Sequence, residues 1–121
     1  MINVPEVIPE QTADVCTGLL EVLRRALEGP GISTLLVRTV GLVLRFPEMG
    51  LPQHRPPELE MRGADGRVRA TITVVADADG FAYLVHPARI ASPLLFPVID
   101  PAQALAYLVA EAHDWNTSRC G

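Results

Sequence analysis

The segment Glu58–His86 constrains the fold of this chain more than any other part of the sequence. It contains three strand-forming segments joined by two corners, GADG at 63–66 and DADG at 77–80. Asp-Gly suits the positive φ that short hairpin loops need. The segment therefore predicts three consecutive antiparallel strands.

Pairing outward from two four-residue loops predicts a register. Glu60 then lies opposite Arg69 in the first hairpin, and Val74 lies opposite Tyr83 in the second. Because side chains alternate between the two faces of a strand, a one-residue slip would scatter the apolar set. The predicted register instead gathers apolar side chains on one face: Leu59, Met61, Val68, Ala70, Ile72, Val74, Ala76, Phe81, Tyr83 and Val85.

The opposite face changes character along its length. It is charged near the first corner, whereas Val75, Ala82 and Leu84 lie near the second corner. Such an apolar patch requires a cover, which can be a helix, a strand or another chain. These three residues are therefore the candidate partner-binding residues.

Charge argues against a nucleic-acid partner. The chain has a net charge of -4, and all 10 of its basic residues are arginines. Arg62, Arg67 and Arg69 gather on the charged end of the sheet, but nucleic-acid binding normally needs a more concentrated basic face. The absence of lysine also excludes Schiff-base and P-loop chemistry, and we attribute it to a GC-rich genome.

Length and hydropathy predict one domain, 1–121, because 121 residues suit a single core. The composition, 49% hydrophobic and 20% charged, is that of a globular protein. No apolar run reaches the roughly 18 residues of a membrane span. The first residues lack the pattern of a secretory signal, so we expect a cytoplasmic protein that does not contact a membrane.

Residues 1–9 are expected to form an extended arm, and residues 10–28 an amphipathic helix. Residues 32–46 fit a strand that bends at Gly41, although their apolar spacing also fits a helix. Residues 47–57 are rich in proline, which predicts a loop rather than sheet interior or helix.

The C-terminal third predicts an edge strand and a helix. The apolar segment 94–99 contains Pro97, which suits the edge of a sheet. Asp100 is placed to cap a helix whose first residue is Pro101. We expect residues 116–121 to form a frayed tail.

These elements define an α+β fold with an N-terminal helix, an antiparallel sheet of about four to five strands around the meander 58–86, and a C-terminal helix. Both helices are expected on one face of the sheet. The arrangement resembles small bacterial chaperone, immunity and assembly proteins. This is a likeness of architecture, which does not determine function.

Candidate chemical groups do not form a catalytic or metal-binding pattern. Asp77–Gly80 resembles part of a calcium loop, but Val75 and His86 would fall where that loop needs carboxylates. Glu111 and His113 are two residues apart and point to different faces of a helix. The sequence predicts no catalytic residue, no metal site and no cofactor.

The cysteines carry no spacing pattern either. Cys16 and Cys120 are the only two in the sequence, too few and too far apart for a disulfide framework or a zinc site. Cys16 is expected to be a small buried side chain within the first helix.

We therefore expect a non-catalytic protein–protein interaction or assembly module, such as an adaptor, a chaperone or an immunity-like subunit. A free sheet edge at 94–99 or 32–46, together with the apolar patch, favours a protein partner or a second copy of the chain, as in a homodimer.

The alternative is a small-molecule-binding protein or an enzyme with a pocket between the helices and the sheet. Its polar groups would be Arg38, Arg45, Tyr83 and His86.

Overall fold

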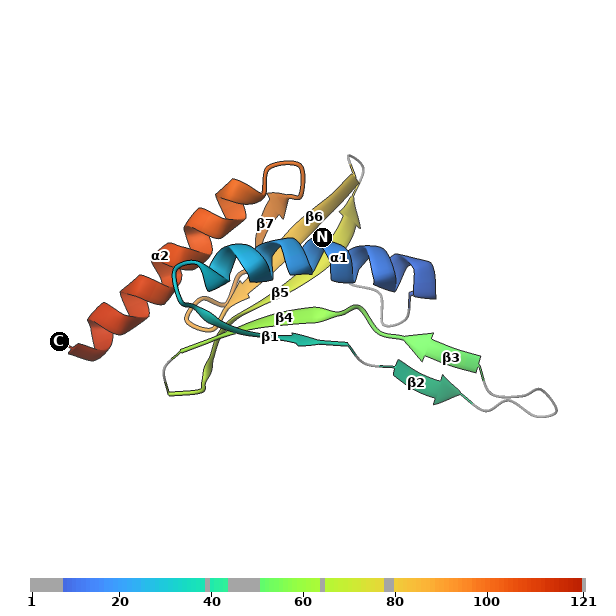
Figure 1. Cartoon of the computed structure of the whole chain (residues 1–121), viewed down its shortest axis with the longest axis horizontal. Helices are drawn as coiled ribbons and strands as arrows, with labels where there is room; N and C mark the ends of the chain where they lie inside the picture. The colour runs from blue at the N-terminus through green and yellow to red at the C-terminus, as the bar shows by residue number, and fades with distance from the viewer. Residues whose placement is uncertain (1–7, 39, 44–50, 64, 78–79, 121) are drawn as a thin grey trace.

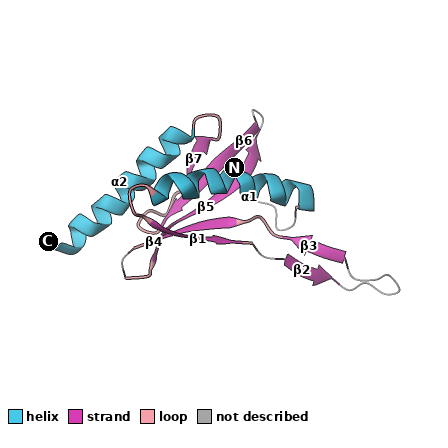
Figure 2. Ribbon diagram, in the orientation of Figure 1, coloured by secondary structure: helices cyan, strands magenta, loops and turns pink. Residues whose placement is uncertain are grey.

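A computed structural model describes two helices and seven strands in residues 8–38, 40–43, 51–63, 65–77 and 80–120. Five of these strands form an antiparallel sheet in the order β1-β4-β5-β6-β7. Both helices lie on the same side of that sheet (Figure 1). The predicted α+β class is confirmed, as is the placement of the helices (Figure 2).

The first helix, α1 (Glu10–Glu28), has the predicted bounds. It follows Pro9, which is extended with φ −61° and ψ 152°, and Gly29 caps its C-terminal end. Its buried side chains recur every three or four residues, which turns one stripe toward the sheet. They are Ala13, Cys16, Leu20, Leu23 and Leu27.

The predicted meander is formed by β4 (Glu58–Arg62), β5 (Val68–Asp77) and β6 (Gly80–Pro87). In the second hairpin, Val74 pairs with Tyr83 as the sequence predicts. Gly80 has a φ of 128°, a conformation that side-chain-bearing residues rarely adopt.

The first hairpin differs from its predicted register. Glu60 pairs with Thr71 rather than with Arg69, and Arg62 pairs with Val68. The predicted cross-strand pair of Glu60 with Arg69 is therefore wrong. The loop is one residue longer than expected, and a β-bulge at Arg69 adds one more residue to β5. The two changes together shift the pairing by two residues, from Arg69 to Thr71 opposite Glu60. Because side chains alternate between faces, a shift of two leaves each side chain beyond the bulge on its predicted face.

The predicted grouping on one face of the sheet is confirmed for every residue except Val68. Val68 lies before the bulge, so it shares the face of Arg62. Ala76 pairs with Phe81 on the predicted face but is exposed near the end of β5. The remaining predicted side chains belong to the core beneath the helices or pack against it: Leu59, Met61, Ala70, Ile72, Val74, Phe81, Tyr83 and Val85.

The described residues of the segment 32–46 form strands, as favoured, but they are divided differently, and residues 39 and 44–46 lie outside the described part of the chain. It contains β1 (Ser33–Val37), at one edge of the main sheet, and β2 (Val40–Val43). Gly41 lies inside β2, so the interruption comes near Arg38 rather than at the glycine.

Within the predicted loop 47–57, residues 51–54 form β3 (Leu51–His54), which pairs with β2 in a separate two-stranded sheet. The loop prediction is therefore wrong for these four residues, while residues 47–50 lie outside the described part of the chain. Pro52 pairs with Leu42 in this ribbon. A two-stranded ribbon has two open edges, where a missing N–H is tolerated.

The last elements are β7 (Leu94–Pro97), at the other edge of the main sheet, and α2 (Pro101–Cys120). Next to the predicted cap, Gln103 Nε2 donates a hydrogen bond to Asp100 Oδ2 at 3.1 Å. This bond joins two side chains, so capping of the helix backbone by Asp100 stays a prediction. The helix continues to Cys120, so the segment expected to fray is helical up to that residue. No helix within the described residues is long and apolar enough to cross a membrane.

Candidate functional site

The predicted partner-binding residues are buried within the single chain. Val75, Ala82 and Leu84 are 3%, 2% and 4% exposed. They form a cluster separate from the main core, on the opposite face of the sheet from the helices. They therefore offer no open surface here, and their part in partner binding stays a prediction.

Two of the predicted pocket residues lie on opposite faces of the sheet. Tyr83 is 1% exposed beneath α1, and its hydroxyl donates a hydrogen bond to the Leu19 carbonyl oxygen at 2.8 Å. Burial raises the pKa of Tyr83 above its ordinary value. His86 is exposed and pairs with Thr71, so its side chain lies on the face of the sheet opposite to that of Tyr83.

The two arginines of that set do not join Tyr83 either. Arg38 Nη1 lies 2.7 Å from Asp14 Oδ1, so its charge is paired with α1. Arg45 lies outside the described residues. The structure thus brings none of the described members of the predicted pocket together.

The arginines near the first hairpin are matched by carboxylates. Arg62 Nη2 lies 2.6 Å from Glu60 Oε1, and Arg69 Nη2 lies 3.1 Å from Asp65 Oδ1. Arg69 is only 4% exposed. Arg67 is open to solvent but lies 3.8 Å from the same aspartate. This end of the sheet is therefore not a concentrated cationic surface.

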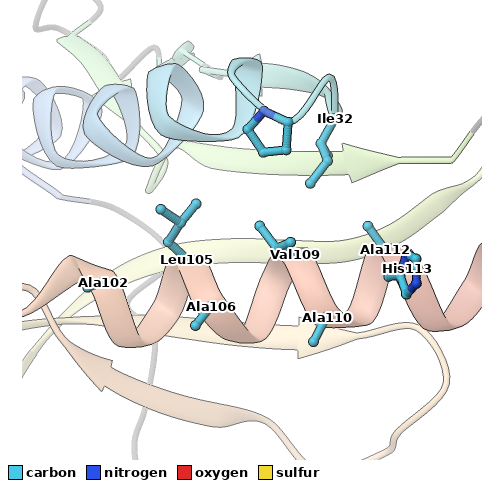
Figure 3. A pocket seen from close by; sticks show the side chains of 9 residues that line it. Ile32, Ala102, Leu105, Ala106, Val109, Ala110, Ala112 and His113 are labelled. Carbon is cyan, nitrogen blue, oxygen red and sulfur yellow. The ribbon is translucent and has the colours of Figure 1, made fainter.

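A groove that the sequence did not predict lies between α2 and the turn that joins α1 to β1. Its volume is about 680 Å³. Leu105, Val109 and Ala112 point from α2 toward Ile32 (Figure 3). Pro30 completes the turn side of the groove.

The groove follows from the spacing of α2. Leu105, Val109 and Ala112 are separated by four and three residues, so they share one side of the helix. They are only partly buried, because α1 ends opposite them and the turn does not cover them fully. Ala106 and Ala110 are exposed and form the outer part of the lining.

Among the described residues, the lining is apolar except for His113. Glu111 is on the same helix, but its carboxylate accepts hydrogen bonds from Arg89 at 2.8 and 3.0 Å. Within the described residues, no three His, Cys, Asp or Glu side chains are grouped to hold a metal. This groove can shelter apolar groups from water.

Comparison of the chain with protein-family models, with characterised proteins and with solved structures finds no match. The fold and the groove define an α+β protein with an apolar groove along its C-terminal helix. Its function must be inferred from that geometry.

Proposed function

We propose that the protein is a non-catalytic interaction module that binds an amphipathic helix of a protein partner in the groove along α2. The observation that carries this proposal is the chemistry of the lining, in which every described residue but His113 is apolar. Apolar side chains of a partner helix would leave water on entering such a groove.

The shape of the groove suits a helix. The lining runs along α2 from Ala102 to His113, a distance of about 16 Å at 1.5 Å per residue. About three turns of a partner helix match that length. Ala106 and Ala110 are exposed and small, so a partner helix could approach α2 closely and pack at roughly 8 Å between axes.

A small apolar ligand is the second candidate, and the volume favours it. A cavity of about 680 Å³ falls within the range of small-molecule sites. Such sites also present several convergent polar groups that orient the ligand. The described part of this lining supplies one polar side chain, that of His113, which supports the protein partner over the small molecule.

A displayed library of random helical peptides tests the proposal. Selected peptides are expected to carry apolar residues at a spacing of three and four, and to shift the NMR methyl signals of Ile32, Leu105 and Val109. Ala110→Arg places a long cation at the groove and is expected to weaken binding at least about tenfold. Ala110 is exposed, so the fold should tolerate the change.

Gln103→Arg is the matched control, since it adds the same side chain to the same helix at an exposed position outside the lining. It is expected to bind the selected peptides as the unmodified chain does. Peptides that bind both variants equally would refute the groove as the site. If apolar fragments bind there and no peptide does, the small-molecule candidate replaces the proposal.

A further inference from the structure

The two edges of the main sheet are built differently. β7 ends in Pro97, which has no N–H to offer to an added strand. β1 has the sequence STLLV, without proline or charge, and no strand of the described residues pairs with its outer side. Natural edge strands usually carry devices that prevent pairing, and β1 carries none within its five residues.

Leu35 is the central residue of β1, and its side chain is 47% exposed. It pairs with Glu60, so it points to the face opposite the helices. The nearest charge along the strand, Arg38, is bound to Asp14 of α1 at 2.7 Å. The edge therefore presents an uncharged backbone with an exposed leucine at its centre.

We propose that two copies of the chain associate through antiparallel pairing of their β1 strands, with Leu35 at the twofold axis. This register uses all five residues of each strand and places Leu35 against the partner's Leu35. Because the same strand serves both copies, the interface is isologous and closes. This inference goes beyond the proposed function and uses a different surface from the groove.

A second copy explains the difference between the edges. Joining two five-stranded sheets through β1 leaves β7 at both outer edges of the combined sheet. Both outer edges then carry Pro97, which opposes further growth. An uncharged strand also avoids the like-charge contact that a twofold axis would otherwise impose.

Sedimentation equilibrium over a range of protein concentrations tests the proposal. The chain is expected to approach twice its mass of 13.1 kDa as concentration rises. Leu35→Lys places two cations at the axis and is expected to raise the dissociation constant of the dimer at least about tenfold. Circular dichroism would show that the variant remains folded.

Leu95→Lys is the matched control. Leu95 is an edge-strand leucine, is 41% exposed, and pairs with Leu84, so it points to the same face as Leu35. This variant is expected to dimerise as the unmodified chain does. A mass of one chain at every concentration, or equal loss of the dimer in both variants, would overturn the proposal.

Crosslinking tests the register. In a Cys120→Ser background, Leu35→Cys is expected to form an intermolecular disulfide under mild oxidation, because directly opposed Cβ atoms lie about 5 Å apart. Leu95→Cys is expected to remain monomeric in the same gel. A dimer without this crosslink would refute the register. Peptide binding by Leu35→Lys is measured in parallel, because Leu35 lies outside the groove. This measurement tells a failure of the dimer proposal from a failure of the groove proposal.

Discussion

At the scale of single residues, Tyr83 shows how a polar group can be assigned the wrong task from sequence. Its place at the centre of a strand marks it as a candidate ligand group. In the structure its hydroxyl binds the Leu19 carbonyl oxygen of α1, 64 residues earlier in the chain. Sequence patterns describe neighbours along one element, so they could not identify this distant partner.

Tyr83→Phe is expected to lower the free energy of unfolding by about 0.5–1.5 kcal/mol, because it removes one partly buried hydrogen bond. Urea denaturation at neutral pH measures this loss. Since a helical carbonyl can accept a second hydrogen bond within its own helix, the lower half of that range is favoured. An unchanged midpoint would show that the hydrogen bond does not contribute to stability.

Alkaline pH provides a separate prediction for the same side chain. Burial raises the pKa of Tyr83 above 10.0 and that of Cys16 above 9.0 in the folded chain. Folding therefore favours the neutral forms of both side chains. Their contribution to the free energy of unfolding is complete below the pKa values of the unfolded chain, and it is lost as pH rises through the pKa values of the folded chain. Stability should fall from about pH 9 upward. Urea titrations should show that the free energy of unfolding falls less above pH 10 in Tyr83→Phe than in the unmodified chain. Parallel pH dependences of the two proteins would show that Tyr83 does not cause the fall.

Arg69 marks the limit of residue-level prediction. The Asp-Gly dipeptide indicated a corner, but not how many residues the corner would contain. Arg69 occupies the bulge, and a Cβ atom on Gly63 would lie only 2.4 Å from its Nε atom. The close approach of a buried arginine to a glycine depends on three-dimensional packing, which the dipeptide alone did not reveal.

At the scale of elements, periodicity predicted both helices and the meander, while β3 was missed. The proline content of 47–57 favoured a loop, yet Pro52 fits a two-stranded ribbon that has no interior strand. The sequence around Asp100 and Pro101 predicted where α2 begins, but it did not predict the groove. Leu105 and Val109 look like core positions in sequence, and only the position of the α1–β1 turn leaves them partly open.

α2 is attached to the β6–β7 connection by an ion pair with one buried member. Glu111 is 4% exposed, and Arg89 contacts both of its carboxylate oxygens. Arg89→Ala is expected to lower the free energy of unfolding by about 1–3 kcal/mol, because it leaves a buried carboxylate without this partner. This loss of stability is smaller than the loss expected for a fully buried ion pair, since the Arg89 side chain is 36% exposed.

The double variant Arg89→Met/Glu111→Met is the control, and urea denaturation compares it with the single variant. Replacing both charges by apolar side chains of similar length is expected to restore stability to within about 1 kcal/mol of the unmodified chain. If the double variant is as unstable as Arg89→Ala, the loss would come from the missing attraction between Arg89 and Glu111, and not from an unpaired buried carboxylate.

At the scale of the whole molecule, the α+β architecture was predictable because one register grouped the apolar side chains of three strands. Side chains of both helices, including Leu20 and Leu108, join those strands in one core cluster. The β2–β3 ribbon is separate from the main sheet and lies past the ends of β1 and β4 (Figure 1).

This division predicts two levels of hydrogen-exchange protection. Amides of the paired strands β5 and β6 should exchange through global unfolding, because they cross the core. Amides of β2 and β3 should exchange through local opening at a lower free energy, since a two-stranded ribbon is marginal alone. Native-state exchange at increasing urea concentration measures both groups. Equal opening energies would show that the ribbon unfolds together with the core.

The bulge at Arg69 also bears on how this chain can change in length. Deleting one residue from the first corner would let β5 straighten and pair Arg62 with the former bulge position, while Met61 would still face Ala70. The inside and outside of the sheet would not exchange. Natural variants shorter by a single residue at this corner could therefore retain the same interior, whereas the same deletion in the middle of β5 would invert half of a strand.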